Sequence, residues 1–477
     1  MGIFSIDIHP DGSRFATGGQ GEDSGRVTIW NMAPITAEKV EKDEKVPKML
    51  CQLDNHLACV NSVRWSFSGR YLASGGDDKL VMVWSFSKYA GGSNPAFGSG
   101  GKMNAESWRC ISTLRGHNGD VLDLAWSPHD VWLATCSVDN TIIIWDADKL
   151  PQMVTILKGH TGLVKGVTWD PVGKYLSSQS DDKSLRIWRT IDWQQEAVIE
   201  EPFKECSGTT LCLRPSWSPD GQYLVSAHAM NNGGPTAQII ERDGWKSDMD
   251  YVGHRKAVTC VVRVQNSTFV VIETKNPAYA CACAVGSRDK SVSVWLTSLK
   301  RPLVVIQDLF AAPVLDISWS SSGLSLMACS LDGTVAYFEF TEKELGKAMS
   351  LEDKVCTKIF LKRYGQTYFR ETTSIHIQQQ CFSLCKLIPT NKQIETRTSD
   401  GRRRITPIFI PAAPDTGEAP APFCSDNVQF SSSSEAKSKI IVEKREDIVV
   451  KPNVTPSNSN SEPLVENTNV SPNKLTT

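Results

Sequence analysis

The sequence has almost no excess charge and no long apolar run, and both absences exclude classes of protein. Its 477 residues include 51 lysines and arginines against 53 aspartates and glutamates, which gives a formal net charge of −2. Bulk cationic attraction to nucleic acid or to an anionic membrane therefore cannot be the basis of its function. No stretch approaches the roughly 18 apolar residues of a membrane-spanning helix, and the first residues lack the features of a signal peptide. We therefore expect a soluble, intracellular protein.

The 14 cysteines form no pattern that is typical of a metal site or a disulfide framework. The closest groups are Cys281 with Cys283 and Cys381 with Cys385. Neither group is a Cys-x-x-Cys pair, and neither has a histidine at zinc-finger spacing. We therefore predict small, reduced, mostly buried cysteines, and we expect neither a metal nor a cofactor.

Tryptophan is absent from the last third of the chain, since all 14 tryptophans fall between Trp30 and Trp319. This divides the chain into an aromatic-rich body, residues 1–340, and a tail. In the body one phrase recurs, a short alternating apolar strand that leads into a turn of proline, aspartate, serine and glycine. Its seven copies begin at Ile3, Cys59, Asp120, Leu163, Leu211, Ala257 and Pro313.

A second phrase follows each copy, as in YLASGGDDKLVMVW from Tyr71, and predicts two more strands joined by a tight polar turn. A fourth strand follows a variable loop. Four antiparallel strands in units of roughly 40–60 residues are typical of a propeller blade, so we predict an all-β, seven-bladed β-propeller. Because the first phrase begins at Ile3, the count is one strand short of seven full blades. Either the last blade has three strands and an open edge, or residues beyond 341 complete it.

Three copies contain a tetrad of histidine, hydroxyl, aspartate and tryptophan that resembles the WD-repeat motif. In such a tetrad the aspartate orients the histidine, the histidine reaches the hydroxyl, and the hydroxyl reaches the indole N–H, so no buried polar group lacks a partner. The same residue types form hydrolase triads, but their repetition inside three blades favours a structural role. The predicted tetrads are His56, Ser74, Asp78, Trp84; His117, Thr135, Asp139, Trp145; and His160, Ser178, Asp182, Trp188.

Later copies depart from this pattern. Blade six keeps His254, Asp289 and Trp295, but Val285 stands where the hydroxyl is expected. Blade seven has Ala328 at the hydroxyl position and Phe338 in place of the tryptophan. Blade five replaces the usual turn with HAMNNGGPTAQII, which is either a drifted repeat or a surface loop used for a partner.

The tail has a different composition. Residues 341–393 mix charges and glutamines without clear periodicity and are predicted to be a linker. Residues 411–477 are rich in proline, serine and asparagine, and such a segment cannot bury enough apolar surface to offset the entropy of ordering it. We therefore predict a disordered end.

Residues 394–410 read IETRTSDGRRRITPIFI and predict a β-hairpin. Asp400-Gly401 is a strong turn signal between two alternating runs. An isolated hairpin is marginally stable, so we expect this one to add a strand to the sheet edge of a partner, with the arginines of 402–404 on carboxylates and Ile405 and Pro407 in apolar pockets. The alternative is a solvated basic cluster or part of a nuclear-import signal.

Several phrases resemble the Hir family of histone chaperones, among them FATGGQGEDSGRVTIWNM, SPHDVWLATCSVDN and YLVSAHAMNNGGPTAQIIER. ETRTSDGRRRITP is similar to the family's short B motif, which binds the anti-silencing-function histone chaperone. The resemblance implies a nuclear scaffold subunit for replication-independent nucleosome assembly. Its propeller would bind a ubinuclein-type subunit, and core histones would be handled indirectly. The residues that the resemblance implies for the chaperone contact are Arg402, Arg403, Arg404, Ile405, Thr406 and Pro407.

Family members are longer, so the resemblance also implies a form that is truncated at both ends, without the N-terminal strand and the C-terminal domain used for self-association. A second interpretation is a generic WD-repeat adaptor, such as a substrate receptor of a ubiquitin ligase, which leaves the arginine hairpin unexplained. An enzyme is not expected, because the sequence has no phosphate-binding glycine loop followed by Lys-Ser/Thr, no metal-ligand cluster, and no catalytic pair outside the tetrads.

Overall fold

The computed structural model describes most of the body and two short segments of the tail. The described residues are 1–22, 24–87, 104–208, 210–263, 270–272, 278–348, 396–397 and 403–404. The predicted disordered end, 411–477, and most of the predicted linker lie outside them. Within the described part of the chain, no helix is long and apolar enough to cross a membrane.

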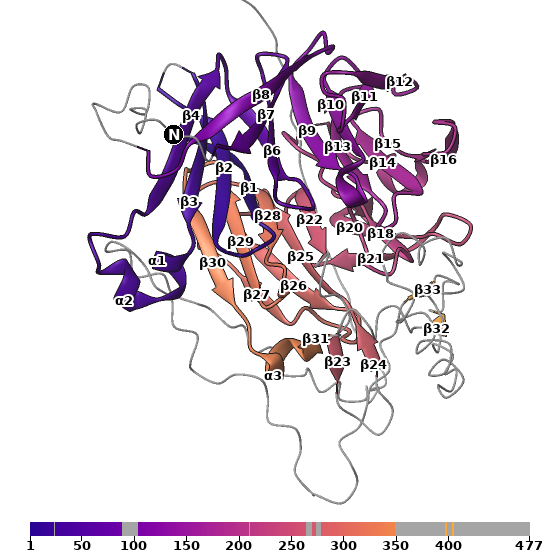
Figure 1. Ribbon diagram of the computed structural model, residues 1–477. Coiled ribbons are helices and arrows are strands. Elements are labelled where there is room, and N and C mark those ends of the chain that lie inside the picture. Colours follow the sequence, from indigo (N-terminus) through magenta and orange to yellow (C-terminus); the bar gives the residue numbers. More distant parts are fainter. Residues whose placement is uncertain are drawn as a thin grey trace, which may run out of the picture. The chain divides into compact units, whose positions relative to one another are not determined.

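Seven antiparallel sheets, one for each copy of the phrase, form the blades of a β-propeller (Figure 1). The first four blades each contain four strands in chain order: β1 (Ile3–Ile8), β2 (Arg14–Gln20), β3 (Gly25–Asn31), β4 (Met49–His56); β5 (Val60–Trp65), β6 (Tyr71–Gly76), β7 (Leu80–Phe86), β8 (Trp108–Arg115); β9 (Val121–Trp126), β10 (Trp132–Ser137), β11 (Ile142–Asp146), β12 (Met153–Leu157); β13 (Val164–Trp169), β14 (Tyr175–Ser180), β15 (Ser184–Arg189), β16 (Gln195–Ile199).

The other three blades are less regular. Blade five contains β17 (Ser216–Trp217), β18 (Tyr223–Val225), β19 (Ala229–Asn231), β20 (Gly234–Glu241) and β21 (Lys246–Val252). Blade six contains β22 (Val258–Arg263), β25 (Ala282–Ser287), β26 (Val292–Leu296) and β27 (Val304–Ile306), and blade seven β28 (Val314–Trp319), β29 (Ser325–Ser330) and β30 (Val335–Glu339).

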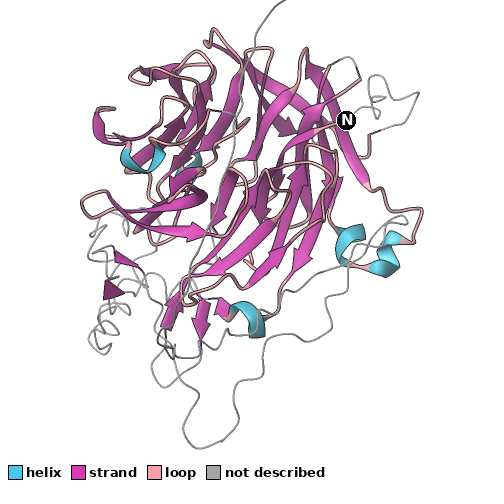
Figure 2. Cartoon of the chain, turned by 180° about the vertical axis from the view of Figure 1, so that it is seen from behind, coloured by secondary structure: helices cyan, strands magenta, loops and turns pink. Residues whose placement is uncertain are grey.

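Short elements lie outside the blades, and Figure 2 shows the helices among the strands. The helices are α1 (Ala33–Thr36), α2 (Glu38–Glu41), α3 (Glu342–Leu345) and the 3-10 turns η1 (Pro128–Asp130) and η2 (Glu201–Phe203). A small sheet contains β23 (Val270–Ile272), β24 (Ala278–Ala280) and β31 (Lys347–Ala348), and a two-stranded hairpin contains β32 (Thr396–Arg397) and β33 (Arg403–Arg404).

Blade five explains the glycine-rich phrase that interrupts the repeat. Both β18 and β19 pair with β20, so the second strand of this blade is broken into two pieces. The turn between β19 and β20 has Asn232 and Gly233 at its centre, with φ values of 51° and 73°. Positive φ at both central residues is what a type I′ hairpin turn requires, and asparagine and glycine adopt it most readily. The phrase is therefore an ordered hairpin inside the blade.

The ring closes between the first and last blades through their innermost strands. The Asp316 carboxylate on β28 accepts hydrogen bonds from the Ser5 hydroxyl (2.7 Å) and from the backbone N–H of Ile6 (3.1 Å) on β1. The Ser318 hydroxyl accepts the backbone N–H of Ile8 at 3.0 Å. Within the described residues no strand pairs with the outer edge of β30, since β31 pairs with β23 instead. Among the described residues the last blade therefore has three strands.

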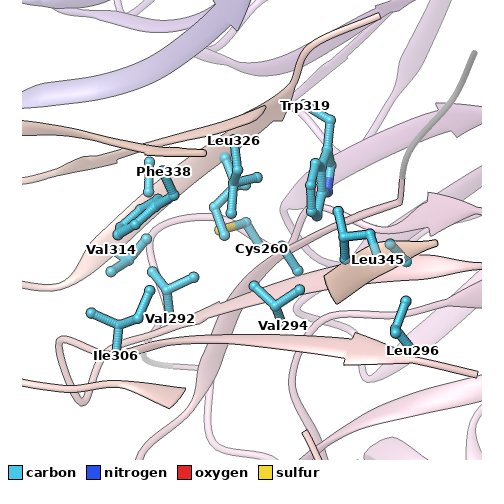
Figure 3. Packing of buried hydrophobic residues seen from close by; sticks show 14 of the residues in the cluster. Cys260, Val292, Val294, Leu296, Ile306, Val314, Trp319, Leu326, Phe338 and Leu345 are labelled. Atoms are coloured by element: carbon cyan, nitrogen blue, oxygen red, sulfur yellow. The ribbon is translucent and has the colours of Figure 1, made fainter. Parts of the chain in front are cut away.

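Apolar side chains fill the spaces between neighbouring blades. Figure 3 shows this packing between blades six and seven, where Leu326 and Phe338 face Val292 and Val294. Leu345 of α3 is buried in the same cluster and fixes the segment after blade seven. A corresponding cluster joins blades seven and one: Ile6, Ile8, Phe15, Met32, Met327 and Cys329.

Candidate functional site

The structure joins each of the three predicted tetrads into one hydrogen-bonded chain. In blade three the Nδ1 atom of His117 lies 3.0 Å from the Asp139 carboxylate, and its Nε2 atom lies 2.9 Å from the Thr135 hydroxyl. That hydroxyl accepts the indole N–H of Trp145 at 3.0 Å. The other two tetrads repeat the order with distances of 2.8–2.9 Å: His56, Asp78, Ser74, Trp84 and His160, Asp182, Ser178, Trp188.

The electrostatics of the tetrads fit a structural role. Burial raises the pKa of Asp139, but hydrogen bonds from His117 and Thr141 outweigh it and hold that pKa well below its usual value. Burial lowers the pKa of His160 despite its contact with Asp182, so this histidine is neutral at pH 7. A neutral histidine that donates from Nδ1 to the carboxylate can accept the serine hydroxyl proton at Nε2, as in a hydrolase triad. The Ser178 hydroxyl, however, is fully buried and already accepts an indole N–H, so a substrate cannot reach it.

Blade six completes its tetrad with a hydroxyl from a different strand. Val285 stands on β25 at the usual hydroxyl position, and Ser293 on β26 is its direct cross-strand partner. The Ser293 hydroxyl lies 2.8 Å from Nε2 of His254 and accepts the Trp295 indole N–H at 2.9 Å. Val285 thus stands at the usual hydroxyl position, as the sequence shows, and the serine opposite it supplies the hydroxyl instead. A serine two residues before the tryptophan was the available sequence signal.

The remaining blades keep only parts of the tetrad. In blade one the Trp30 indole N–H donates to the Thr17 hydroxyl at 2.8 Å. In blade seven, Asp332 accepts the backbone N–H of Ala311 at 2.6 Å, while Ala328 pairs with Ala336 across the sheet. Asp332 therefore still holds the segment that leads into blade seven, although apolar residues occupy the hydroxyl and tryptophan positions of the tetrad.

The centre of the ring contains a charged network that the sequence analysis missed. Each innermost strand contributes two positions to this region. One lies three residues before the tryptophan near the end of the strand, or before the residue that replaces this tryptophan, and the other lies one residue before it. Register shifts occur beside the first of these positions in several blades, as between Val314 and Asp316, and such bulges re-aim side chains. In chain order the two sets are Ser5, Ser62, Asp123, Gly166, Arg214, Cys260, Asp316 and Asp7, Arg64, Ala125, Thr168, Ser216, Val262, Ser318.

Two arginines connect the aspartates of this network. The Arg64 guanidinium contacts both carboxylate oxygens of Asp316, at 2.6 and 3.1 Å. Arg214 lies 3.3 Å from Asp123 and 3.4 Å from Asp316. Arg214 also donates to three backbone carbonyls that belong to different blades: Phe4, Asn61 and Leu315. The network therefore joins blades one, two, three, five and seven.

A glycine leaves room for the segment that carries Arg214. A Cβ atom added to Gly166 would lie 1.7 Å from the carbonyl oxygen of Leu213, so only glycine permits this close approach. The Leu213 N–H donates to the Lys165 carbonyl at 3.2 Å. Gly166 thus allows blade five to pack against blade four at the centre of the ring.

The network keeps most of its groups charged although it is buried. Burial alone would lower the pKa of Arg64, but the Asp316 and Asp123 carboxylates outweigh it and raise that pKa. Burial raises the pKa of Asp316, but Arg214 and Arg64 lower it below its usual value. Asp7 differs, because burial raises its pKa to about 6 in spite of Arg64. Asp7 is therefore the least compensated carboxylate of the network.

In the tail, the structure forms the predicted hairpin. Thr396 pairs with Arg404 and Arg397 with Arg403, so the two described segments pair with each other on either side of the predicted turn. Asp400 and Gly401 themselves lie outside the described residues. Of the six residues predicted to contact the chaperone, Arg403 and Arg404 lie on β33. The other four, Arg402, Ile405, Thr406 and Pro407, lie outside the described residues.

Eight of the ten described cysteines are buried, as the sequence predicted. Burial raises the pKa of Cys51 to about 11 and that of Cys59 to about 12, so both thiols stay protonated and unreactive near neutral pH. In the described ranges no group of three or more histidine, cysteine or acidic side chains could hold a metal ion.

Comparison with known proteins gives two family matches. The family described as the CAF1B/HIR1 beta-propeller domain matches residues 2–345, and the HIRA B motif matches residues 392–413. The first match covers the seven blades, and the second covers the hairpin β32–β33.

The chain is also similar to complete relatives in animals and fungi. It is 57% identical to Protein HIRA of Homo sapiens, over 87% of this chain and 45% of that protein. It is 58% identical to the Protein HIRA homolog of Drosophila melanogaster, over 87% of this chain and 41% of the relative. Identity to Protein HIR1 of Cryptococcus neoformans is 40%, over 76% of this chain and 40% of the relative.

The chain spans less than half the length of these relatives. The blades and the hairpin nevertheless lie in the order that the two family matches give, and the buried tetrads offer no catalytic hydroxyl. With a matching propeller, a matching B motif and 57% identity over most of its length, this chain is a WD-repeat protein that belongs to the HIRA family.

Proposed function

We propose that the chain is a scaffold subunit of a nuclear histone chaperone complex that assembles nucleosomes independently of DNA replication. In this proposal residues 394–410 recruit a histone-carrying chaperone of the anti-silencing-function type. The propeller binds a ubinuclein-type subunit, and core histones reach the complex through the recruited chaperone. The observation that carries the proposal is the presence of a matching propeller and a B motif in one chain.

The hairpin suits recruitment by strand addition. Among the described residues, β32 and β33 pair with each other and with no other strand, and a strand edge of this kind has backbone N–H and C=O groups that can extend the sheet of a partner. An isolated hairpin is marginal in water, so binding energy would stabilise it. Three successive arginines bring positive charge to a partner surface that carries carboxylates, and each guanidinium can contact a carboxylate through two hydrogen bonds.

The propeller suits a scaffold because its polar groups are used internally. The tetrads and the central network pair the buried histidines and aspartates with groups of the same chain. The ring therefore presents loops and edges that partners can contact.

Charge reversal at the hairpin tests the proposal. The change of Arg402, Arg403 and Arg404 to Glu should abolish capture of the purified chaperone and leave the melting temperature of the propeller unchanged. A matched control reverses three exposed lysines of the propeller to Glu: Lys39, Lys45 and Lys48. Equal capture by the hairpin variant and the wild-type chain would disprove recruitment through the hairpin.

A second binding experiment distinguishes the proposed scaffold from a generic WD-repeat adaptor. Wild-type chain is presented with the histone chaperone and with the adaptor subunit of a ubiquitin ligase, each in purified form. We expect the chain to bind the histone chaperone and not the ligase adaptor. Binding of the ligase adaptor alone would favour the substrate-receptor interpretation.

A further inference from the structure

A cavity of about 240 Å³ opens at one end of the ring, where the innermost strands lead into the first turn of each blade. Its floor is formed by charged side chains of the central network, among them Asp7 and Arg64. The cavity is smaller than the roughly 300–1,000 Å³ of typical small-molecule sites. It can accommodate one long side chain, with the rest of a ligand outside.

Tryptophan rings form part of the walls, beside serine and threonine side chains such as Ser127 and Thr168, and three of the indole N–H groups are already used. The indole N–H of Trp65 donates to the Asp7 carbonyl at 3.2 Å, that of Trp126 to the Arg64 carbonyl at 3.1 Å, and that of Trp169 to the Ala125 carbonyl at 2.9 Å. These rings therefore offer the cavity only carbon and π surface. Such a surface suits an alkyl chain that ends in a cation.

The charged side chains at the floor of the cavity carry one more negative charge than positive charge. Asp7, Asp123, Arg64 and Arg214 line the cavity, and the Asp316 carboxylate contacts both arginines, so this group contains three carboxylates and two guanidinium groups. Asp170 also lines the cavity, but it pairs with Arg242 at 3.1 Å. Arg64 and Arg214 both contact Asp123 and Asp316, and no described cation lies within 4 Å of the Asp7 carboxylate.

The Asp7 carboxylate keeps acceptor capacity for a further ligand. One oxygen accepts the Trp65 backbone N–H at 2.8 Å, and the other accepts the Ser318 hydroxyl at 2.9 Å. Each carboxylate oxygen can accept two hydrogen bonds, so one position on each remains. An ammonium or guanidinium group would fill these positions and neutralise the excess charge.

The rim of the cavity suits an extended chain. Pro10, Pro128, Pro171 and Pro219 line it, and the Phe67 side chain beside it is 51% exposed. Aromatic surfaces are typical of grooves that bind extended, proline-containing segments. An exposed phenylalanine at the rim has apolar surface that such a segment would cover.

We propose that this cavity binds an extended segment of a partner protein that inserts one lysine or arginine side chain onto Asp7, with proline or small apolar residues against the rim. The charge of the floor selects this occupant, because an acidic side chain would add to the excess of carboxylates and an apolar one would leave Asp7 unpaired. The proposal does not depend on the hairpin, and the two can fail separately.

Binding of blocked pentapeptides to the full chain, measured by isothermal titration calorimetry, tests this. The probes are Pro-Ala-Arg-Ala-Pro and the same peptide with lysine, citrulline or glutamate at its centre. We expect saturable binding of at least one cationic peptide, about tenfold or more tighter than citrulline or glutamate. The citrulline peptide is the matched control, since it keeps the shape of arginine without its charge.

Variants of the chain locate the site. Asp7→Asn should lower the affinity for the cationic peptide about tenfold, to the affinity of the wild-type chain for the citrulline peptide. Asp11→Asn, at an exposed turn, should leave the affinity unchanged. Phe67→Ser should weaken binding several-fold, and because Phe67 is exposed this variant keeps the fold even if Asp7→Asn melts early. Equal affinity for arginine and citrulline, equal affinity of Asp7→Asn and wild-type chain, or no saturable binding of either cationic peptide at millimolar concentration would overturn the proposal.

Discussion

Ser293 gives the sharpest test of the structural tetrads, because one hydroxyl serves two buried groups. Ser293→Ala leaves Nε2 of His254 and the indole N–H of Trp295 without a partner. Each buried group left unsatisfied costs about 1–3 kcal/mol, so we expect the free energy of unfolding to fall by roughly 2–5 kcal/mol. Urea unfolding followed by tryptophan fluorescence and circular dichroism measures the change.

A double variant separates the hydrogen bonds from the local packing. Since Val285 and Ser293 are cross-strand partners, Val285→Ser together with Ser293→Val returns the hydroxyl to the position that it has in blades two to four. We expect this double variant to recover most of the lost stability, to within about 1 kcal/mol of wild type. If Ser293→Ala unfolds at the wild-type urea concentration, or if the double variant is no more stable than the single one, the hydroxyl does not have this role.

Three further predictions concern the ring. Asp139→Ala removes the partner of His117 and of the Asn118 N–H, so the free energy of unfolding should fall by about 1–3 kcal/mol. The control variant Asp148→Ala, at an exposed position, should leave the stability unchanged. Equal melting temperatures for the two variants would contradict this prediction. Gly166→Ala places a Cβ atom against the Leu213 carbonyl, so it should lower the free energy of unfolding by about 1–3 kcal/mol or reduce the yield of folded protein. If this variant is as stable as the wild-type chain, blades four and five do not approach each other so closely. Because burial raises the pKa of Asp7 to about 6, the folded state holds a proton between about pH 4 and pH 6 that the unfolded state lacks, so this contribution to stability falls as pH rises through that window. Asp7→Asn should therefore gain about 2 kcal/mol relative to wild type from pH 4 to pH 6, and a difference independent of pH would refute the assignment.

The blades could be predicted because their signals are local. Each innermost strand, such as β9 with VLDLAW, combines alternating apolar residues with a turn that follows at once. The tetrads of blades two to four repeat a fixed spacing, so one copy explains the others. The hairpin was found from Asp400-Gly401 for the same reason, since a turn signal between two alternating runs is also local, although it did not specify the pairing of Arg397 with Arg403.

What the sequence did not reveal depends on register and on contacts between distant residues. Ser293 replaces the blade-six hydroxyl only because β25 and β26 pair so that it stands opposite Val285, which residue spacing alone does not specify. Arg64 and Asp316 are 252 positions apart and meet only after the ring has closed. Gly166 is informative only when the Leu213 carbonyl is seen beside it.

The most direct measurement of the central claim is the affinity of the full chain for the purified histone chaperone, with and without residues 394–410. The account predicts saturable binding to the complete chain and none to the deletion variant, whose propeller should melt at the wild-type temperature because the hydrogen bonds that close the ring lie within residues 5–318. Undiminished affinity of the deletion variant would contradict the account, since the ring alone would then recruit the chaperone.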